Sequence, residues 1–217
     1  KLTQAIPVKA PVQQLNLFGE EIERLGTSEK YELKTVVVNT TAAMTDLLAN
    51  LKSARRISVD TETTSTDPMR AELVGISLST EAGTGYYIPV GHRQGLQLAK
   101  SEAIAALKPV LEDESIPKVG HNIKYDLLML KRNGILLKPV TLDTMLAEWL
   151  INPSSRNLGL KNLAWVRLGV EMTHIDELIG RGKTQRQMDE VPVDDAAPYA
   201  AADAEVTLRL VPLLEAD

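Results

Sequence analysis

Cysteine is absent from the 217-residue chain, which excludes disulfide bonds, thiolate nucleophiles and zinc sites built on cysteine. Aromatic residues are few, with one Phe and two Trp, and this argues against an extended base-stacking platform. No apolar run is long enough to span a bilayer, and the first residues do not resemble a signal peptide. We therefore expect a cytoplasmic protein that has no membrane partner.

The remaining composition is that of a globular protein, with 44% hydrophobic and 24% charged residues. The net charge of -5 argues against broad non-specific binding of nucleic acid, although local contacts to phosphates remain open. Residues 1–30 contain proline, glycine and polar residues with little periodicity, which is typical of a linker or arm. We expect one folded domain over residues 31–217.

Periodic patterns begin at Tyr31. Apolar and β-branched runs predict strands over residues 34–39, 55–60, 73–78 and 85–90, with the last three forming an antiparallel half-sheet, and a parallel edge strand over 118–120. Helical patterns cover residues 41–51, 101–112, 122–130, 143–151, 160–168 and 194–214, with Thr40 or Thr41, Ser101 and Asn122 as N-cap candidates. This order predicts an α/β fold, with a sheet that has helices on both sides.

The strand that ends near Asp60 and Glu62 carries the first chemical signal. Residues i and i+2 of a strand point to the same face, so the two carboxylates lie side by side and repel each other. Hard oxygen ligands in this arrangement favour Mg²⁺ or Mn²⁺. An acidic turn after a strand is also common without a metal, so this pair alone is weak support for a metal site.

Two helical acids extend the signal. Asp126 lies at the border of the apolar stripe of its helix, and a solvated helix face is the simpler explanation for it alone. Asp203 lies within the apolar stripe of the last helix, one turn after Tyr199. A buried carboxylate requires a cation, a metal or strong donors, so pairing with Arg209 or Arg167 is the structural alternative.

Four converging acids, Asp60, Glu62, Asp126 and Asp203, would suit a two-metal phosphoryl-transfer site. The motifs Asp60-Thr-Glu62, Asn122-x-x-x-Asp126 and Tyr199-x-x-x-Asp203 occur in the order found in the DEDDy branch of 3'-5' exonucleases. The sequence around them, such as residues 118–126 and 199–204, resembles the proofreading domains of bacterial DNA polymerase I from about residue 31 to 214. This resemblance implies a ribonuclease-H-like mixed sheet.

The resemblance also implies roles for individual residues. Asp60, Glu62 and Asp203 would hold one divalent cation, Asp60 and Asp126 a second, with Mg²⁺ or Mn²⁺ expected and Zn²⁺ an alternative at one site. Tyr199 would orient the attacking water, with Glu62 beside it. Contacts to the 3' end of single-stranded DNA are expected at Thr61, Thr66, His121, Asn122 and Ile175, and, from their positive charge, at Arg156, Arg181 and Lys183.

Three of these positions depart from the family pattern. Thr66 stands where a wedging Leu is frequent, Ile175 where an aromatic residue often stacks, and His121 where Gln is frequent. These changes affect how tightly the DNA end is held, whereas the acids and Tyr199 are complete. Arg156, Lys161, Arg181, Lys183 and Arg186 are candidates for phosphate contacts or for simple solvation.

Outside the catalytic motifs, Gln14-Leu15-Asn16-Leu17-Phe18 resembles the pentapeptide that docks bacterial replication proteins onto the sliding clamp. Such a peptide works from a flexible tether, and the alternative is a strap packed on the domain itself. His92 and His174 lack metal-ligand spacing and are predicted to lie at the surface.

We expect a nucleoid-associated fragment of a DNA polymerase I, with a polymerase domain in cis beyond this chain, that releases nucleoside 5'-monophosphates from a 3' end. The first alternative is RNA trimming of the ribonuclease D type. The second is a catalytically silent DNA-binding scaffold.

Overall fold

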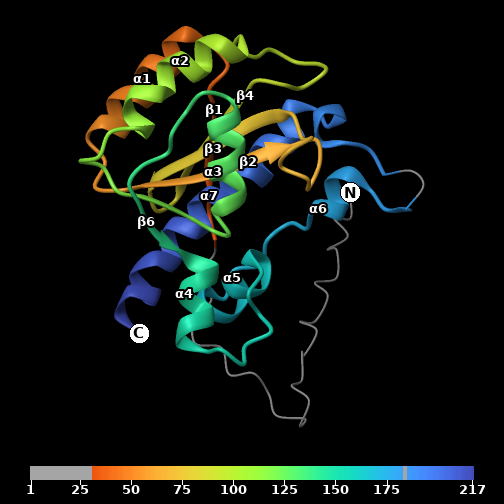
Figure 1. Cartoon of the computed structure of the whole chain (residues 1–217). Coiled ribbons are helices and arrows are strands. Elements are labelled where there is room, and N and C mark those ends of the chain that lie inside the picture. The colour runs from red at the N-terminus through yellow and green to blue at the C-terminus, as the bar shows by residue number, and fades with distance from the viewer. Residues whose placement is uncertain (1–30, 183–184) are drawn as a thin grey trace, which may run out of the picture.

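The computed structural model describes residues 31–182 and 185–217, shown in Figure 1. The predicted arm 1–30, the peptide Gln14 to Phe18 and Lys183 lie outside the described residues. The strands are β1 (Lys34–Val37), β2 (Ile57–Thr63), β3 (Leu73–Glu81), β4 (Thr84–Pro89), β5 (Lys118–Gly120) and β6 (Val140–Asp143). The helices are α1 (Thr41–Lys52), α2 (Lys100–Leu111), α3 (Lys124–Arg132), α4 (Thr144–Ile151), α5 (Leu160–Leu168), α6 (Ile175–Ile179), the 3₁₀ helix η2 (Met188–Glu190) and α7 (Val193–Ala216).

One mixed sheet carries the fold, in the order β1-β4-β3-β2-β5-β6. The strands β2, β3 and β4 pair antiparallel, as the sequence predicts, whereas β1 on β4 and the run β2-β5-β6 are parallel. The prediction that 118–120 forms an edge strand is wrong, because β6 pairs outside it. Four residues of moderate exposure make β6, and so short a run is hard to separate from the start of the following helix by pattern alone.

The strand β2 is shifted relative to the predicted range 55–60, because it begins at Ile57 and continues through the acids to Thr63. Its neighbour β5 pairs only with Ile57 and Ser58 and then ends at Gly120. The carboxyl half of β2 therefore has β3 on one side and no paired strand on the other. This open edge lies where residues from helices can approach Asp60 and Glu62.

Helices cover both faces of the sheet. Side chains from α1, α2 and α3 form the largest apolar cluster with alternate residues of β2 to β4, among them Val59, Ile76 and Leu78. The long α7 packs across β1 to β5 on the other face, and Figure 1 shows α1 and α2 well separated from α4 and α5. Because successive side chains of β2 point to opposite faces of the sheet, Val59 faces the first cluster and Asp60 faces α7.

Several helix ends differ from the sequence prediction. The side chain of Thr40 caps α1 as expected, but α2 begins after Ala99, so Ser101 lies inside the helix and does not cap it. Asn122 is not an N-cap either, since α3 begins at Lys124 and Asn122 has a positive φ of 54°. Asp143 caps α4 by accepting from two backbone amides.

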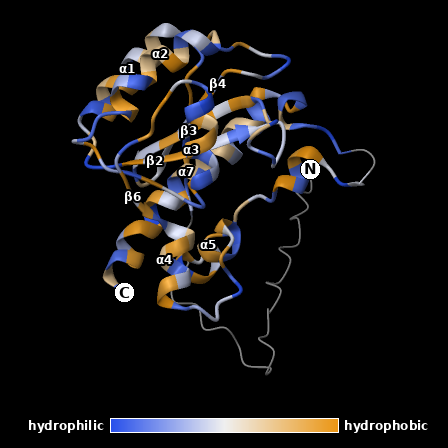
Figure 2. Cartoon of the chain, viewed as in Figure 1, coloured by the Kyte–Doolittle hydropathy of each residue, from blue (hydrophilic) through white to orange (hydrophobic). Residues whose placement is uncertain are grey.

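Exposed apolar side chains concentrate on α4, where Leu146, Trp149 and Leu150 are about half exposed or more. Figure 2 shows this helix largely in orange. None of the helices among the described residues is long and apolar enough to cross a bilayer.

Candidate active site

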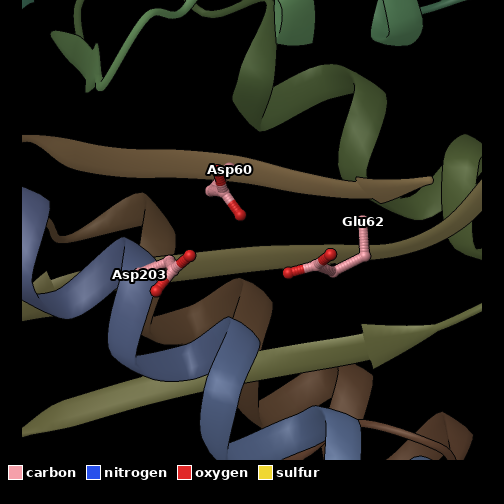
Figure 3. A group of neighbouring side chains, drawn as sticks. All are labelled: Asp60, Glu62 and Asp203. Carbon is pink, nitrogen blue, oxygen red and sulfur yellow. The ribbon is translucent and has the colours of Figure 1, made fainter. Parts of the chain in front are cut away.

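Three carboxylates meet between β2 and α7. Asp60, Glu62 and Asp203 each offer an oxygen atom, and these atoms all lie within 4.8 Å of one another. In Figure 3 the side chains of Asp60 and Glu62 from β2 and of Asp203 from α7 point into one space. Glu62 and Asp203 are each only 8% exposed, so little water is available to screen their charges. The group consists of hard oxygen donors alone, which suits a divalent cation such as Mg²⁺ or Mn²⁺.

The pKa values of the three acids show that burying them together is unfavourable. Burial, followed by the charges of Asp126 and Glu62, holds the pKa of Asp60 well above its usual range. Burial and the Asp203 charge raise the pKa of Glu62 to about 8. Burial also raises the pKa of Asp203, against the lowering effect of Lys161. These acids therefore hold a proton more tightly than free carboxyl groups do, and a bound cation would favour their ionised form.

Asp126 approaches from the other side of β2. It lies in the first turn of α3, is 4% exposed, and its Oδ1 accepts a 2.6 Å hydrogen bond from the hydroxyl of Thr61. Burial raises the pKa of Asp126 to about 7, although the bond from Thr61 lowers it. The turn that starts α3 is fixed by Asp143, whose carboxylate accepts from the amides of Asn122 and Ile123. Asp126 lies outside the group of three but close enough to raise the pKa of Asp60.

Lys161, from α5, supplies a cation to the group. Its ammonium forms a close ion pair with Oδ1 of Asp203 and lies 4.3 Å from the centroid of the Tyr199 ring. The predicted alternatives Arg209 and Arg167 do not pair with Asp203: Arg209 lies over the ring of Tyr31, and Arg167 pairs with Glu148 and Asp217. Burial and the charge of Asp203 raise the pKa of the Tyr199 phenol, which therefore stays protonated.

A groove of about 850 Å³ opens onto the acids. Its floor is formed by β2, and its walls by the 63–66 segment, α6 and the 185–188 segment. Six of the predicted catalytic, substrate or phosphate-contact residues besides the three clustered acids line it: Thr61, Thr66, Asn122, Ile175, Arg186 and Tyr199.

The comparisons with known proteins agree with this geometry. A family profile described as 3'-5' exonuclease matches residues 35–217. The chain belongs to this 3'-5' exonuclease family. DNA polymerase I from Chloroflexus aurantiacus is 39% identical over 213 residues, which make up 97% of this chain and 22% of that protein. The exonuclease chain thus spans about a fifth of the length of this curated relative.

Solved structures confirm the ribonuclease-H-like fold. NrnC from Brucella melitensis superposes with a TM-score of 0.60 at 25% identity, over 76% of this chain and 73% of that one. Escherichia coli RNase D, described as an exoribonuclease involved in structured RNA processing, superposes with a TM-score of 0.63 at 23% identity, over 85% and 45% of the two chains. The latter likeness concerns the fold only.

The remaining predicted residues lie elsewhere in the exonuclease domain. His121 is not among the groove residues. Its Nδ1 contacts the hydroxyl of Thr144 at 2.8 Å, and burial lowers the pKa of its imidazole to about 4. Arg156 is exposed and outside the groove. Arg181 is exposed as well and pairs with Asp176. The role of these residues at a DNA end stays a prediction.

Other groove residues were not predicted from the sequence. The phenol of Tyr125 contacts the hydroxyl of Thr63 at 2.6 Å and donates to the carbonyl of Ser65, so it holds one wall of the groove. Its place directly before Asp126 in the second motif is the signal that could have revealed it. Gln185 and Met188 line the opposite wall, in a segment that has no clear pattern.

His92 corrects another prediction, because it is 5% exposed and not at the surface; His174 is exposed as expected. The ring of His92 contacts the Tyr87 hydroxyl at 2.6 Å and the Val191 carbonyl at 2.8 Å. It thereby connects the sheet to the segment that carries the Met188 wall of the groove.

Proposed function

We propose that this exonuclease domain removes nucleotides from the 3' end of single-stranded or frayed DNA by a two-metal mechanism, as the proofreading domain of a DNA polymerase I. The single observation that carries the proposal is the group of Asp60, Glu62 and Asp203 in the groove beside Tyr199. Asp60, Glu62 and Asp203 are the proposed ligands of one divalent cation. Asp60 and Asp126 are the proposed ligands of a second. Mg²⁺ or Mn²⁺ is expected, with Zn²⁺ as an alternative at one position.

The reaction is hydrolysis of the terminal phosphodiester. Water attacks phosphorus, the bond from phosphorus to the 3' oxygen of the preceding nucleotide breaks, and that oxygen takes up a proton. The products are a nucleoside 5'-monophosphate and a strand that is one nucleotide shorter. When bound, the divalent cations would lower the pKa of the water and stabilise charge on the leaving oxygen.

The residues of the chain position the reactants. Tyr199 keeps its proton in the groove, so its hydroxyl can donate to or orient a water molecule beside Glu62. Glu62 can accept a hydrogen bond from that water. Thr61 holds Asp126 through its hydroxyl, which fixes the distance between the α3 acid and the β2 strand. Thr66 and Ile175 lie in the groove where the terminal nucleotide would bind.

The similarity to DNA polymerase I supports the view that this domain is part of a longer polymerase chain. We infer a polymerase domain in cis, a growing DNA strand as the source of the 3' end, and a location at the nucleoid in the cytoplasm. Docking of Gln14 to Phe18 onto a sliding clamp is part of the same proposal. It is tested by measuring whether the Phe18→Ala chain still binds a purified clamp.

Trimming of RNA in the manner of ribonuclease D is a second candidate function, since Escherichia coli RNase D has the same fold. The two share a fold, so the substrate distinguishes them. The higher identity to DNA polymerase I, 39% against 23%, favours DNA.

The decisive experiment is digestion of 5'-labelled single-stranded DNA and RNA of one sequence by the purified 217-residue chain with Mg²⁺. We expect stepwise shortening of the DNA and release of 5'-monophosphates, and loss of both in Asp60→Ala and Asp203→Ala. Equal activity of the wild type and both variants would falsify the catalytic assignment, and absence of activity in the wild type would favour a silent scaffold. Faster digestion of RNA would favour the ribonuclease D type.

A further inference from the structure

Lys161 contacts two members of the proposed catalytic group at once. Its ammonium pairs with Asp203 and lies over the ring of Tyr199. The side chains of Lys161 and Asp203 are only 17% and 11% exposed, so the pair is shielded from water. The mechanism of phosphodiester hydrolysis described above gives no task to this lysine.

The Lys161 ammonium would repel a divalent cation bound to Asp203. A divalent ion bound by Asp203, Asp60 and Glu62 would lie within a few ångströms of the ammonium, because both positive groups use the carboxylate of Asp203. Two like charges at that separation repel strongly where water is scarce. Lys161 and the divalent cation therefore compete for Asp203.

A second cavity offers the ammonium another position. This cavity of about 300 Å³ is lined by both Lys161 and Tyr199, and also by the acidic residues Glu171 and Asp195. Both acids are exposed, and no cation of the described residues forms an ion pair with either. A lysine side chain has a flexible four-carbon stem and three rotatable donors, so it can exchange one carboxylate for another.

We propose that Lys161 is an internal competitor of the divalent cation: its ammonium holds Asp203 while the site is free of metal and moves to Glu171 and Asp195 when the cation binds. The inference rests on the proposed function, which makes Asp203 a metal ligand. It assigns Lys161 a positioning task. The lysine keeps the acid group in place before the metal arrives and sets the metal concentration at which the site fills.

The test measures Mn²⁺ binding directly, by isothermal calorimetry and by the electron paramagnetic resonance signal of free Mn²⁺, on the full 217-residue chain. We expect Lys161→Met to bind Mn²⁺ at least about tenfold more tightly than the wild type, because the competing charge is removed. Lys100→Met is the matched control, since it removes the same charge from a surface pair with Glu72, and its affinity should stay within about twofold. Unchanged or weaker binding by Lys161→Met overturns the inference.

The double variant Glu171→Gln with Asp195→Asn tests the second position of the ammonium. We expect it to bind Mn²⁺ about threefold or more weakly, because Lys161 loses its alternative partners, and to have no effect in the Lys161→Met background. An effect of equal size in both backgrounds overturns the inference, as does unchanged affinity in the double variant. If Lys161→Met does not fold, unchanged Mn²⁺ affinity of the double variant in the wild-type background still overturns the inference. Absence of Mn²⁺ binding by the wild type overturns the proposed two-metal function itself, and this inference with it.

Discussion

The two faces of the sheet serve opposite purposes. On the face of α1 and α2, buried apolar side chains such as Val59, Ile76 and Leu78 form one continuous core. On the α7 face, the alternate residues of the same strands include the acids of the groove and the buried hydroxyls of Ser58 and Ser77, which have no hydrogen-bond partner among the described residues. The first face therefore only stabilises the fold, whereas the second, besides its apolar cluster of Val74 and Tyr87 with α7, accepts a loss of stability to hold charge in place.

The largest expected effect is a loss of exonuclease activity without a loss of stability, on substitution of Asp60. Asp60→Asn removes a charge but preserves the shape of the side chain, so exonuclease activity should fall about a thousandfold or more. The metal-free variant should be as stable as the wild type or more stable, because one repelling carboxylate is gone. Activity assays and chemical denaturation in the presence of a chelator measure the two effects. A large loss of metal-free stability would contradict the comparison of the two faces.

The opposite face should respond in the opposite way. Leu78 is fully buried in the large apolar cluster, so Leu78→Ala should lower the free energy of unfolding by about 2–5 kcal/mol. Activity of the molecules that remain folded should change little at low temperature. Urea denaturation and an activity assay at the same temperature provide the measurement, and a small change in stability would count against the assignment of this face.

The pH dependence of stability should reveal the repelling acids. The pKa of Glu62 in the folded state, about 8, lies above the usual value of 4.5, so the folded state binds a proton more tightly than the unfolded state does. Stability of the metal-free protein should therefore fall as the pH rises from 7 to 8, a window in which histidine in the unfolded chain, with a pKa of about 6.5, is already mostly deprotonated. We expect the melting temperature to fall in this window, and to fall less in Glu62→Gln or with Mg²⁺ present. A rise in the wild type would refute this prediction.

The smallest expected effect concerns the wall of the groove. Thr66 is one of the groove residues, and a larger apolar side chain there would contact the terminal base. Thr66→Leu should lower the KM for single-stranded DNA by roughly threefold and leave the free energy of unfolding nearly unchanged. Steady-state kinetics on DNA oligonucleotides measure this, with Thr45→Leu, on the exposed surface of α1, as control. An unchanged KM would show that the base does not reach position 66.

The sequence predicted the acids better than the surfaces around them. Asp60, Glu62 and Asp203 came from patterns that are local, such as the two-residue period of β2 and the position of Asp203 in the apolar stripe of α7. The partner Lys161 was not assigned to Asp203, because the approach of α5 to α7 depends on packing between distant segments. The same reason applies to His92, whose partners lie on β4 and 99 residues further along the chain.

Short elements account for the other errors. The four residues of β6 and the cap of α2 depend on weak local preferences that pairing and packing override. Asn122 shows the same effect, because Asp143 on β6 binds the amides of residues 122 and 123 and holds the backbone in a turn before α3. Because β6 was not predicted, Asp143 was not expected beside residues 122 and 123, and the turn before α3 was missed.

The alanine surface of α7 determines how near the helix comes to the sheet. Ala201 faces Gly85 on β4, where even a single added Cβ atom would lie 2.5 Å from the Ala201 carbonyl oxygen. Asp203 is two residues further along α7, so the same close approach sets how far its carboxylate stands from Asp60 and Glu62. The small side chains at this contact thus set the spacing between α7 and the sheet, and with it the separation of the three carboxylates.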